Sequence, residues 1–142
     1  MIIADTGFWL ALANRRDAYH ETAVARLEAL KEPLITTWPV LTETFHLLGS
    51  RLGSYAQISF MDGWYENAFR VHSLDGFDIP RIHALFHQYR DLPMDLADAS
   101  LVILAEHLGH GRIFSTDERD FQTYRWKRHE PFENLLPPLV TP

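Results

Sequence analysis

The sequence predicts an α/β fold with a mainly parallel sheet and helices on both of its faces. Short apolar runs alternate along the chain with longer segments whose apolar residues recur at helical spacing. Such alternation of strand and helix is typical of a parallel sheet covered by helices. The chain has 142 residues, of which 46% are hydrophobic, so we expect one domain over residues 1–142 with a sizeable core.

Two strands and two helices are expected in the first part of the chain. The apolar run MIIAD, residues 1–5, is predicted to be a strand, and TGFWLALAN, residues 6–14, the first helix. Residues 19–31 have apolar residues at helical spacing, and Pro33 ends this second helix. The run LITT, residues 34–37, is the second predicted strand.

The next helix is expected over residues 39–53. Thr37 is a suitable N-cap, and Pro39 suits the first helical turn. Apolar residues then recur on one face, and Gly49 and Gly53 predict where the helix ends.

The second half of the chain repeats the alternation. The segment LADASLVILAEHL, residues 96–108, has its leucines in helical register, and the glycines of GHG stop it. The tail, residues 131–142, is too rich in proline for a helix and is expected to add a short edge strand. The remaining expectations are a helix over 54–68 interrupted near Gly63, a strand over 69–74, a helix over 79–89 opened by Asp78 and Pro80, and a strand over 112–116.

Composition excludes several classes of protein. The chain has no cysteine, which excludes disulfides, thiolate catalysis and cysteine-based zinc sites. A formal net charge of −6 argues against a protein that binds DNA regardless of sequence, because such proteins carry a strong basic excess. The first apolar run has no basic leader, and no window approaches the ~18 apolar residues of a membrane span. We therefore expect a soluble cytoplasmic protein.

Four acidic residues from separate segments are expected at one edge of the sheet. Asp5 and Asp117 each follow a predicted strand, whereas Glu43 and Asp98 lie in the first turns of two predicted helices. Because parallel α/β sheets place their sites at the carboxyl ends of the strands, we expect these four carboxylates to converge.

Converging carboxylates favour a bound divalent cation. Two unit charges about 4 Å apart repel by about 4 kcal/mol at an effective dielectric constant of about 20, and a hard cation offsets this repulsion. Oxygen-only ligands suit Mg²⁺ or Mn²⁺. Such an ion can activate water and neutralise charge on a phosphate. These are the usual functions of metal ions in enzymes that cleave phosphodiester bonds.

Each acid also has a purely structural interpretation. Asp5 and Asp117 could be turn residues, and Glu43 could be a solvated acid near the positive end of a helix. Asp95 occupies the position of an N-cap, with Asp98 at the third helical position of a capping box. Asp98 can fill that position and still face the site.

The ordered set of these motifs resembles the PIN-domain family, and within it the VapC-type toxin ribonucleases of prokaryotic toxin–antitoxin pairs. The resemblance spans about residues 1–125. Each stretch alone is weak evidence for the family. Taken together, in the same order and spacing as in the family, the stretches are specific for it. The stretches are IIADTGFWLAL, TTWPVLTETFHLL, DLPMDLADASLVILAEHLG and RIFSTDERDF.

This resemblance implies roles for individual residues. The family's four acids correspond to Asp5, Glu43, Asp98 and Asp117, which would be both the catalytic and the metal-binding residues. Asp98 rather than Asp95 matches the third acid, because the apolar helix follows it directly. We therefore expect Asp95 to cap the helix and Asp98 to bind the ion. The residues expected to support the site are Thr6, Asp95 and Thr116.

The resemblance also implies a fold, an activity and partners. The fold would be a three-layer α/β/α sandwich. The activity would be that of an endoribonuclease dependent on Mg²⁺ or Mn²⁺, in which metal-activated water cleaves an RNA phosphodiester bond. Members of the family are usually homodimers, and their partner is a small antitoxin protein whose tail lies across the acidic site. The acidic balance of this chain is consistent with a basic partner segment.

Basic residues could track the backbone of the RNA. The densest basic run, RWKRH at residues 125–129, contains an aromatic side chain, and RNA binding uses such a mixture of charge and stacking. The alternative for this run is a solvated tail. The candidate RNA-binding residues are Arg112, Arg119, Arg125, Lys127 and Arg128.

Other functions fit the sequence less well. His83 and His87 have the spacing of a zinc pair, but the glutamate of a zinc protease helix is missing between them. A phosphatase of the haloacid-dehalogenase kind needs a second aspartate two residues after Asp5, where this chain has Gly7. A non-catalytic PIN-like module that only docks RNA or a protein partner stays open, although the presence of all four acids counts against it.

Overall fold

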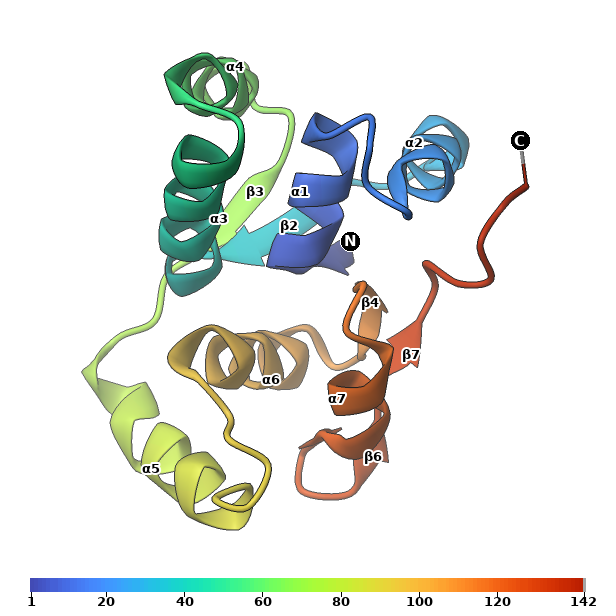
Figure 1. The fold of residues 1–142 in the computed structure, drawn as a ribbon. Helices are drawn as coiled ribbons and strands as arrows, with labels where there is room; N and C mark the ends of the chain where they lie inside the picture. The colour runs from blue at the N-terminus through green and yellow to red at the C-terminus, as the bar shows by residue number, and fades with distance from the viewer. Residues whose placement is uncertain (142) are drawn as a thin grey trace.

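The computed structural model describes residues 1–141 and contains a five-stranded parallel sheet (Figure 1). The strand order is β3-β2-β1-β4-β7, and the central strand β1 pairs with β2 and β4. The mainly parallel sheet predicted from the sequence is confirmed. The strands are β1 (Ile2–Ala4), β2 (Leu34–Thr37), β3 (Arg70–His72), β4 (Arg112–Phe114) and β7 (Glu133–Asn134).

Helices cover both faces of the sheet, so the fold is the expected three-layer sandwich (Figure 1). The connections from β1 to β2 and from β2 to β3 move in one direction, whereas the chain then returns past β1 to reach β4. Because parallel crossovers are right-handed, the two sets of connecting helices lie on opposite faces. The first set is α1 (Thr6–Ala13), α2 (His20–Ala29), α3 (Trp38–Arg51) and α4 (Ser54–Tyr65); the second is the 3₁₀ turn η1 (Gly76–Asp78), α5 (Ile79–Gln88) and α6 (Leu96–Leu108).

This reversal of direction occurs between β1 and β4. The connection that leaves β1 goes to one face of the sheet, and the connection that leads to β4 comes from the other. In open parallel sheets such a reversal leaves a crevice beyond the carboxyl ends of the two strands, where ligands bind. The residues that follow β1 and β4 are therefore placed at the natural position of a site.

The core lies between the sheet and the helices on either side. β1 is buried along its full length, and α6 is buried over most of its circumference because β2, α3 and α5 pack around it. Two buried hydroxyls also join α3 to α6, since Thr37, the N-cap of α3, lies 2.6 Å from the Oγ atom of Ser100. This contact fixes the spacing of the two helices that carry Glu43 and Asp98.

One feature predicted from a glycine is wrong, because α4 continues through Gly63 without interruption. α3 ends at Arg51, between the two glycines that were predicted to end it. Gly49 lies inside α3 and serves a close contact, because a Cβ atom there would collide with the side-chain amide of Gln57 on α4. Gly53 does mark the break between the helices, and its φ of 105° is one that glycine adopts without strain.

The chain after β4 contains elements that the sequence did not predict. They are the short helix α7 (Glu118–Thr123) and a hairpin of β5 (Arg125–Trp126) with β6 (Glu130–Pro131). The basic run, residues 125–129, forms β5 and the turn of this hairpin, in which Lys127 and Arg128 take positive φ values of 44° and 70°. The edge strand predicted for the tail is confirmed as β7. Within residues 1–141, none of the helices combines the length and the apolar character needed to cross a membrane.

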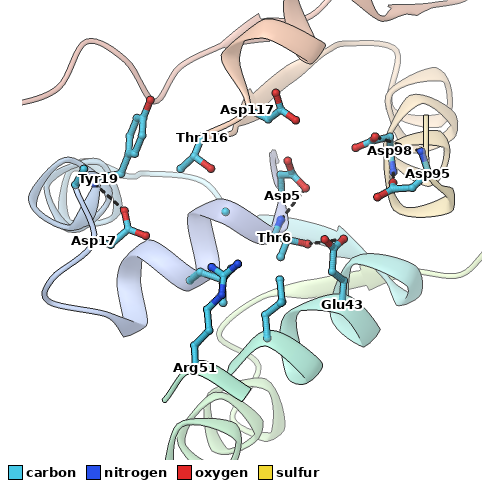
Figure 2. Close-up of a pocket in the computed structure, with 14 residues that line it drawn as sticks. Asp5, Thr6, Asp17, Tyr19, Glu43, Arg51, Asp95, Asp98, Thr116 and Asp117 are labelled. Carbon is cyan, nitrogen blue, oxygen red and sulfur yellow. Dashed lines mark hydrogen bonds between the residues drawn. The ribbon is translucent and has the colours of Figure 1, made fainter. Parts of the chain in front are cut away.

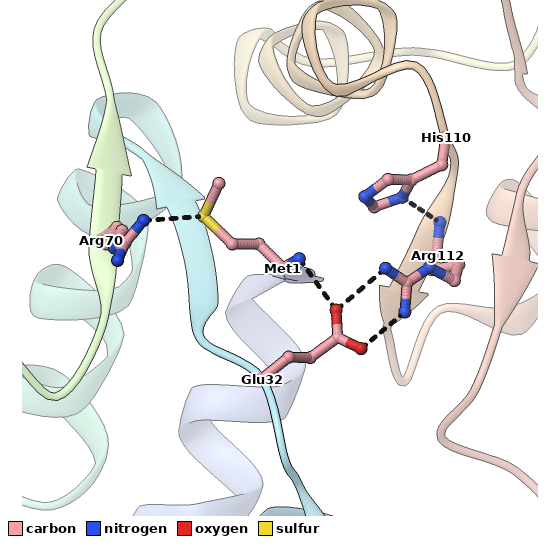
Figure 3. Close-up of polar contacts among 5 residues, drawn as sticks. All are labelled: Met1, Glu32, Arg70, His110 and Arg112. Atoms are coloured by element: carbon pink, nitrogen blue, oxygen red, sulfur yellow. Dashed lines mark hydrogen bonds and ion pairs between the residues drawn. The ribbon is translucent and has the colours of Figure 1, made fainter.

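An ion-pair network closes the opposite end of the sheet, at the amino ends of the strands (Figure 3). The N-terminal amine of Met1 lies 2.8 Å from Glu32, and two guanidinium nitrogens of Arg112 each donate to a Glu32 oxygen at 2.9 Å. Hydrogen bonds from Arg112 and then from the N-terminal amine lower the pKa of Glu32 to about 2. Arg112 is thus engaged at the end of β4 that lies away from the crevice.

We expect Glu32→Gln to lower stability slightly at neutral pH and to lose this effect in acid. The folded-state pKa of Glu32 lies below its ordinary value of 4.5, so the stabilisation is present above pH 4.5 and is lost as the pH falls toward 2. Urea unfolding at about pH 7 and about pH 2.5 measures the difference from wild type. Glu28→Gln changes an exposed glutamate without an ion pair in residues 1–141 and is the control. The same pH dependence in both variants would contradict the prediction.

Candidate active site

A pocket of about 560 Å³ opens at the carboxyl ends of β1 and β4 (Figure 2). Six carboxylates line it, and so do all seven residues predicted for the centre of the site. The fold therefore brings together acids that are far apart in the sequence. The seven residues are Asp5, Thr6, Glu43, Asp95, Asp98, Thr116 and Asp117.

Asp5 follows β1 and is buried in the wall of the pocket, with 8% of its surface exposed. Its Oδ1 atom accepts a hydrogen bond from the backbone N–H of Thr6 at 2.7 Å, and its Oδ2 atom accepts one from Ser115 at 3.0 Å. Burial raises the pKa of Asp5 to about 6; the two hydrogen bonds oppose this shift, and the charges of Glu43 and Asp117 add to it. Strongly shifted acids in a pocket are candidates for function.

Glu43 lies in the second turn of α3 and is partly buried. Its Oε2 atom accepts a hydrogen bond from the hydroxyl of Thr6 at 3.4 Å. Burial and then the charge of Asp95 raise the pKa of Glu43, while the bond from Thr6 lowers it. Glu43 is thus turned toward the pocket and is not a fully solvated acid of the helix surface.

Asp95 and Asp98 form the predicted capping box at the start of α6. Asp95 Oδ1 accepts from the backbone N–H of Asp98 at 2.7 Å, and Asp98 Oδ2 accepts from the backbone N–H of Asp95 at 3.4 Å. Asp98 Oδ2 also accepts from the hydroxyl of Tyr124 at 3.0 Å, which leaves Oδ1 without a hydrogen bond among residues 1–141. Burial, followed by the charges of Asp95 and Asp5, raises the pKa of Asp98 far above its ordinary value. The capping role of Asp95 is confirmed, and ion binding by Asp98 stays a prediction.

Asp117 lies at the exposed rim of the pocket as the N-cap of α7, where its Oδ1 atom accepts from the backbone N–H of Asp120 at 3.2 Å. Its own backbone N–H donates to Ser115 Oγ at 3.0 Å. Ser115, fully buried, therefore joins Asp5 to Asp117. Ser115 was not predicted from the sequence, where the adjacent Thr116 is the expected supporting residue, because the order of neighbouring hydroxyls does not reveal which one faces Asp5.

Thr116 lines the pocket beside Gly7, and the two residues are in close contact. A Cβ atom at Gly7 would collide with the hydroxyl of Thr116. The position that would carry the second aspartate of a haloacid-dehalogenase phosphatase thus has no room for a side chain, which agrees with setting that function aside.

Three further polar residues of the pocket were not anticipated: Asp17, Tyr19 and Arg51. Asp17 accepts from the backbone N–H of Tyr19 at 2.8 Å, and the hydroxyl of Tyr19 donates to Glu118 at 2.9 Å, which ties the α1–α2 loop to α7. Arg51, in the last turn of α3, is the one basic side chain among the described residues that line the pocket, and it points inward (Figure 2). It is exposed and makes no hydrogen bond or ion pair within residues 1–141.

The five candidate RNA-binding residues lie outside the lining of this pocket. Arg112 is paired with Glu32 at the far end of the sheet, and Arg125 donates to the last carbonyl groups of α7. These two arginines have structural partners. The other three are exposed, and their contact with RNA stays a prediction; they are Arg119, Lys127 and Arg128.

The chemistry of the donor set fits a hard divalent cation. The pocket offers carboxylate and hydroxyl oxygens, and an ion would offset the repulsion between the buried charges of Asp5 and Asp98. Among residues 1–141, however, no three histidine, aspartate or glutamate side chains lie close enough together to hold one ion. The side chains as placed therefore do not form a ready-made metal site.

Comparison with known proteins finds relatives in Mycobacterium tuberculosis, although no family model matches the chain. The chain is 48% identical over 60 residues to the 23S rRNA-specific endonuclease VapC20, a match that covers 42% of this chain and 45% of VapC20. It is 23% identical over 124 residues to ribonuclease VapC26, a match that covers 87% of this chain and 92% of VapC26. In the first match, the chain spans less than half the length of its relative.

The fold matches the crystal structure of Mycobacterium tuberculosis VapC20, described as a sarcin–ricin-loop-cleaving toxin. The TM-score is 0.77 at 24% sequence identity, and the match covers 84% of this chain and 92% of the VapC20 chain. At this identity the structural match shows the fold, and it extends the likeness well beyond the segment matched in sequence.

We expect Asp98→Asn to raise the melting temperature of the metal-free protein at about pH 8. The substitution removes a partly buried charge that Asp95 and Asp5 repel, and the amide oxygen can still accept the hydrogen bond from Tyr124. Thermal unfolding with excess chelator measures the shift. Asp62→Asn, an exposed position on α4, should leave the melting temperature unchanged. A lower melting temperature for Asp98→Asn would show that its charge is not a source of strain.

Proposed function

The chain is a VapC-type PIN-domain protein, and from that premise we propose that it is a divalent-metal-dependent endoribonuclease that acts as the toxin of a toxin–antitoxin pair. The observation that carries the proposal is the pocket in which four carboxylates from separate segments meet. Its place at the reversal of strand order is where parallel sheets bind their ligands. The relatives VapC20 and VapC26 are named as an endonuclease and a ribonuclease, which supports the same class of activity.

In the proposed site, Asp5, Asp98 and Asp117 would hold a Mg²⁺ or Mn²⁺ ion. Glu43 would hold a second ion or orient a water molecule. A bound ion of this kind supplies a water of lowered pKa and neutralises charge on the scissile phosphate. With such a water available, no protein nucleophile is needed.

Hydroxyl groups of the chain orient three of these acids. Each donates a hydrogen bond to one carboxylate oxygen, which limits rotation of the acid and leaves lone pairs for a cation. The supporting residues therefore contribute to the order of the site before any ion binds. The pairs are Ser115 with Asp5, Tyr124 with Asp98, and Thr6 with Glu43.

We propose ribosomal RNA as the first substrate class to test, since VapC20 is named as specific for 23S rRNA. As partners we propose a small antitoxin protein and a second copy of the chain in a homodimer. Six carboxylates around one pocket and a net charge of −6 favour an antitoxin segment that is basic.

A non-catalytic PIN-like module that docks RNA or a protein partner is the alternative. It is favoured by the spacing of the acids, of which no three in residues 1–141 lie within reach of one ion. Metal binding without RNA cleavage would support this alternative over the ribonuclease.

The decisive experiment is cleavage of 23S rRNA and of a mixed RNA substrate by purified protein, with Mn²⁺ or with chelator. We expect wild type to cut only with the metal, and Asp98→Asn to cut neither substrate under either condition. Asp62→Asn is the matched control and should cut like wild type.

Equal cutting by wild type and Asp98→Asn would show that Asp98 is not needed for cleavage and is not part of the active site. If wild type binds Mn²⁺, as measured by a rise in melting temperature, and cuts neither substrate, the docking module becomes the better interpretation. A ligand at ~100 times its dissociation constant adds about 2.7 kcal/mol of stability, so such binding is easily detected.

We expect Arg51→Ala to raise KM for RNA by about tenfold or more, with a smaller effect on kcat. Arg51 points into the pocket without a protein partner, and a charge-assisted hydrogen bond to a phosphate contributes about 1.5–3 kcal/mol. Steady-state cleavage with a fluorescent RNA measures both constants. Arg90→Ala changes an exposed arginine that follows α5 and lies outside the lining of the pocket, and it should behave like wild type. An unchanged KM for Arg51→Ala would exclude contact with substrate.

A further inference from the structure

A second groove begins at the rim of the acidic pocket. It has a volume of about 600 Å³ and lies between the first turns of α3 and α6. Glu43 and Asp95 line both the groove and the pocket, so the two spaces adjoin at these residues. The other residues of the groove are Trp38, Pro39, Thr42, His46, Leu96 and Ala97.

Trp38 presents a fixed aromatic surface in this groove. Half of its surface is exposed, at 50%, although tryptophan is usually well buried in folded proteins. Its indole Nε1 donates to Ser73 Oγ at 2.9 Å, and its ring packs edge-to-face against Trp64 with the ring centroids 5.0 Å apart. Because the ring is held from two sides, a ligand that stacks on it would cost little side-chain entropy.

The remaining side chains complement a flat ligand with polar edges. Leu96, from the first turn of α6, is 49% exposed and adds a second apolar surface. Thr42 and His46 lie one turn apart on α3 and offer a hydroxyl and an imidazole at the same groove. An aromatic surface beside hydrogen-bonding groups is the combination with which proteins bind the unpaired bases of RNA.

We propose that this groove binds one unpaired base of the RNA by stacking it on Trp38, while the phosphate next to that base lies in the acidic pocket. The inference rests on the proposed function, because the pocket supplies the position of the phosphate. Because the two spaces share Glu43 and Asp95, a base in the groove and the phosphate next to it in the pocket would occupy adjoining positions. Trp38 would then help determine where the RNA is cut.

A base is a better occupant of the groove than a second copy of this chain. A two-fold interface across the groove would bring Glu43 and Asp95 of one copy toward the same carboxylates of the other. Like charges placed across an interface are unfavourable. A neutral base, in contrast, can lie beside these acids without adding negative charge to the groove.

The test compares cleavage of a short single-stranded RNA by wild type, Trp38→Ala, Trp38→Phe and Phe77→Ala with Mn²⁺. We expect Trp38→Ala to raise KM about tenfold, the size of one base–aromatic stack, and to change kcat less. Trp38→Phe keeps an aromatic ring and should stay close to wild type. Phe77→Ala is the matched control, because Phe77 is 94% exposed and lies outside both spaces.

A set of RNAs in which one nucleotide at a time lacks its base identifies the partner of Trp38. We expect a single abasic position next to the cleavage site to raise KM about tenfold for wild type, and to add nothing further for Trp38→Ala. Such coupling shows that the ring and that base act together, which a general loss of stability would not produce. If Trp38→Ala does not fold, as judged by circular dichroism, the RNAs that lack one base are tested with wild type and Trp38→Phe only. If none of these RNAs has a raised KM, the inference is overturned.

The outcomes separate this inference from the proposed function. Cleavage by wild type with an unchanged KM for Trp38→Ala overturns base stacking and leaves the ribonuclease intact. A change from dimer to monomer in Trp38→Ala, measured by light scattering, assigns the groove to a second copy and also overturns it. If wild type neither binds nor cuts RNA, the proposed function itself fails and the inference fails with it.

Discussion

The burial of carboxylates beside one another at the carboxyl ends of β1 and β4 is the constraint on which the rest of the structure depends. Burial, and to a smaller extent the charges of Glu43 and Asp117, raises the pKa of Asp5, so this carboxyl is costly to ionise in place. The fold limits this cost by starting helices at the pocket: Asp5 caps α1, Asp95 and Asp98 cap α6, and Asp117 caps α7. Backbone N–H groups and the positive ends of these helices thus face the negative charges.

These acids can cap a helix and bind a cation at the same time. An N-cap uses one carboxylate oxygen to accept a backbone N–H, and the second oxygen stays available for a hydroxyl or a cation. Asp98 illustrates this division, since its Oδ2 atom takes the hydrogen bonds of the capping box and of Tyr124. A sequence pattern that signals a helix start can therefore also mark a binding site. Helix capping and ion binding are not exclusive alternatives, because one side chain can do both.

The sequence predicted those features that follow from local periodicity and from the order of strands and helices. The strand before Asp5 and the helix of residues 96–108 were predicted with little error, because buried apolar runs and a capping box are local signals. The role of Gly49 was not predicted, because it depends on a contact with Gln57 on another helix, which no local pattern reveals. Arg51 and Tyr19 reach the pocket only through the packing of α3 and of the α1–α2 loop, so their place in it depends on tertiary structure.

The hydrogen bond from Ser115 to Asp5 joins residues 110 positions apart and has a consequence for synthesis of the chain. The first acid leaves the ribosome early, but its partner strand β4 and the fourth acid, Asp117, are made last among the parts of the pocket. A growing chain that stops before β4 contains Asp5, Glu43 and Asp98 without the strand that aligns them. The pocket is therefore complete only after β4 and Asp117 have been made, and a product that ends before β4 lacks part of the site.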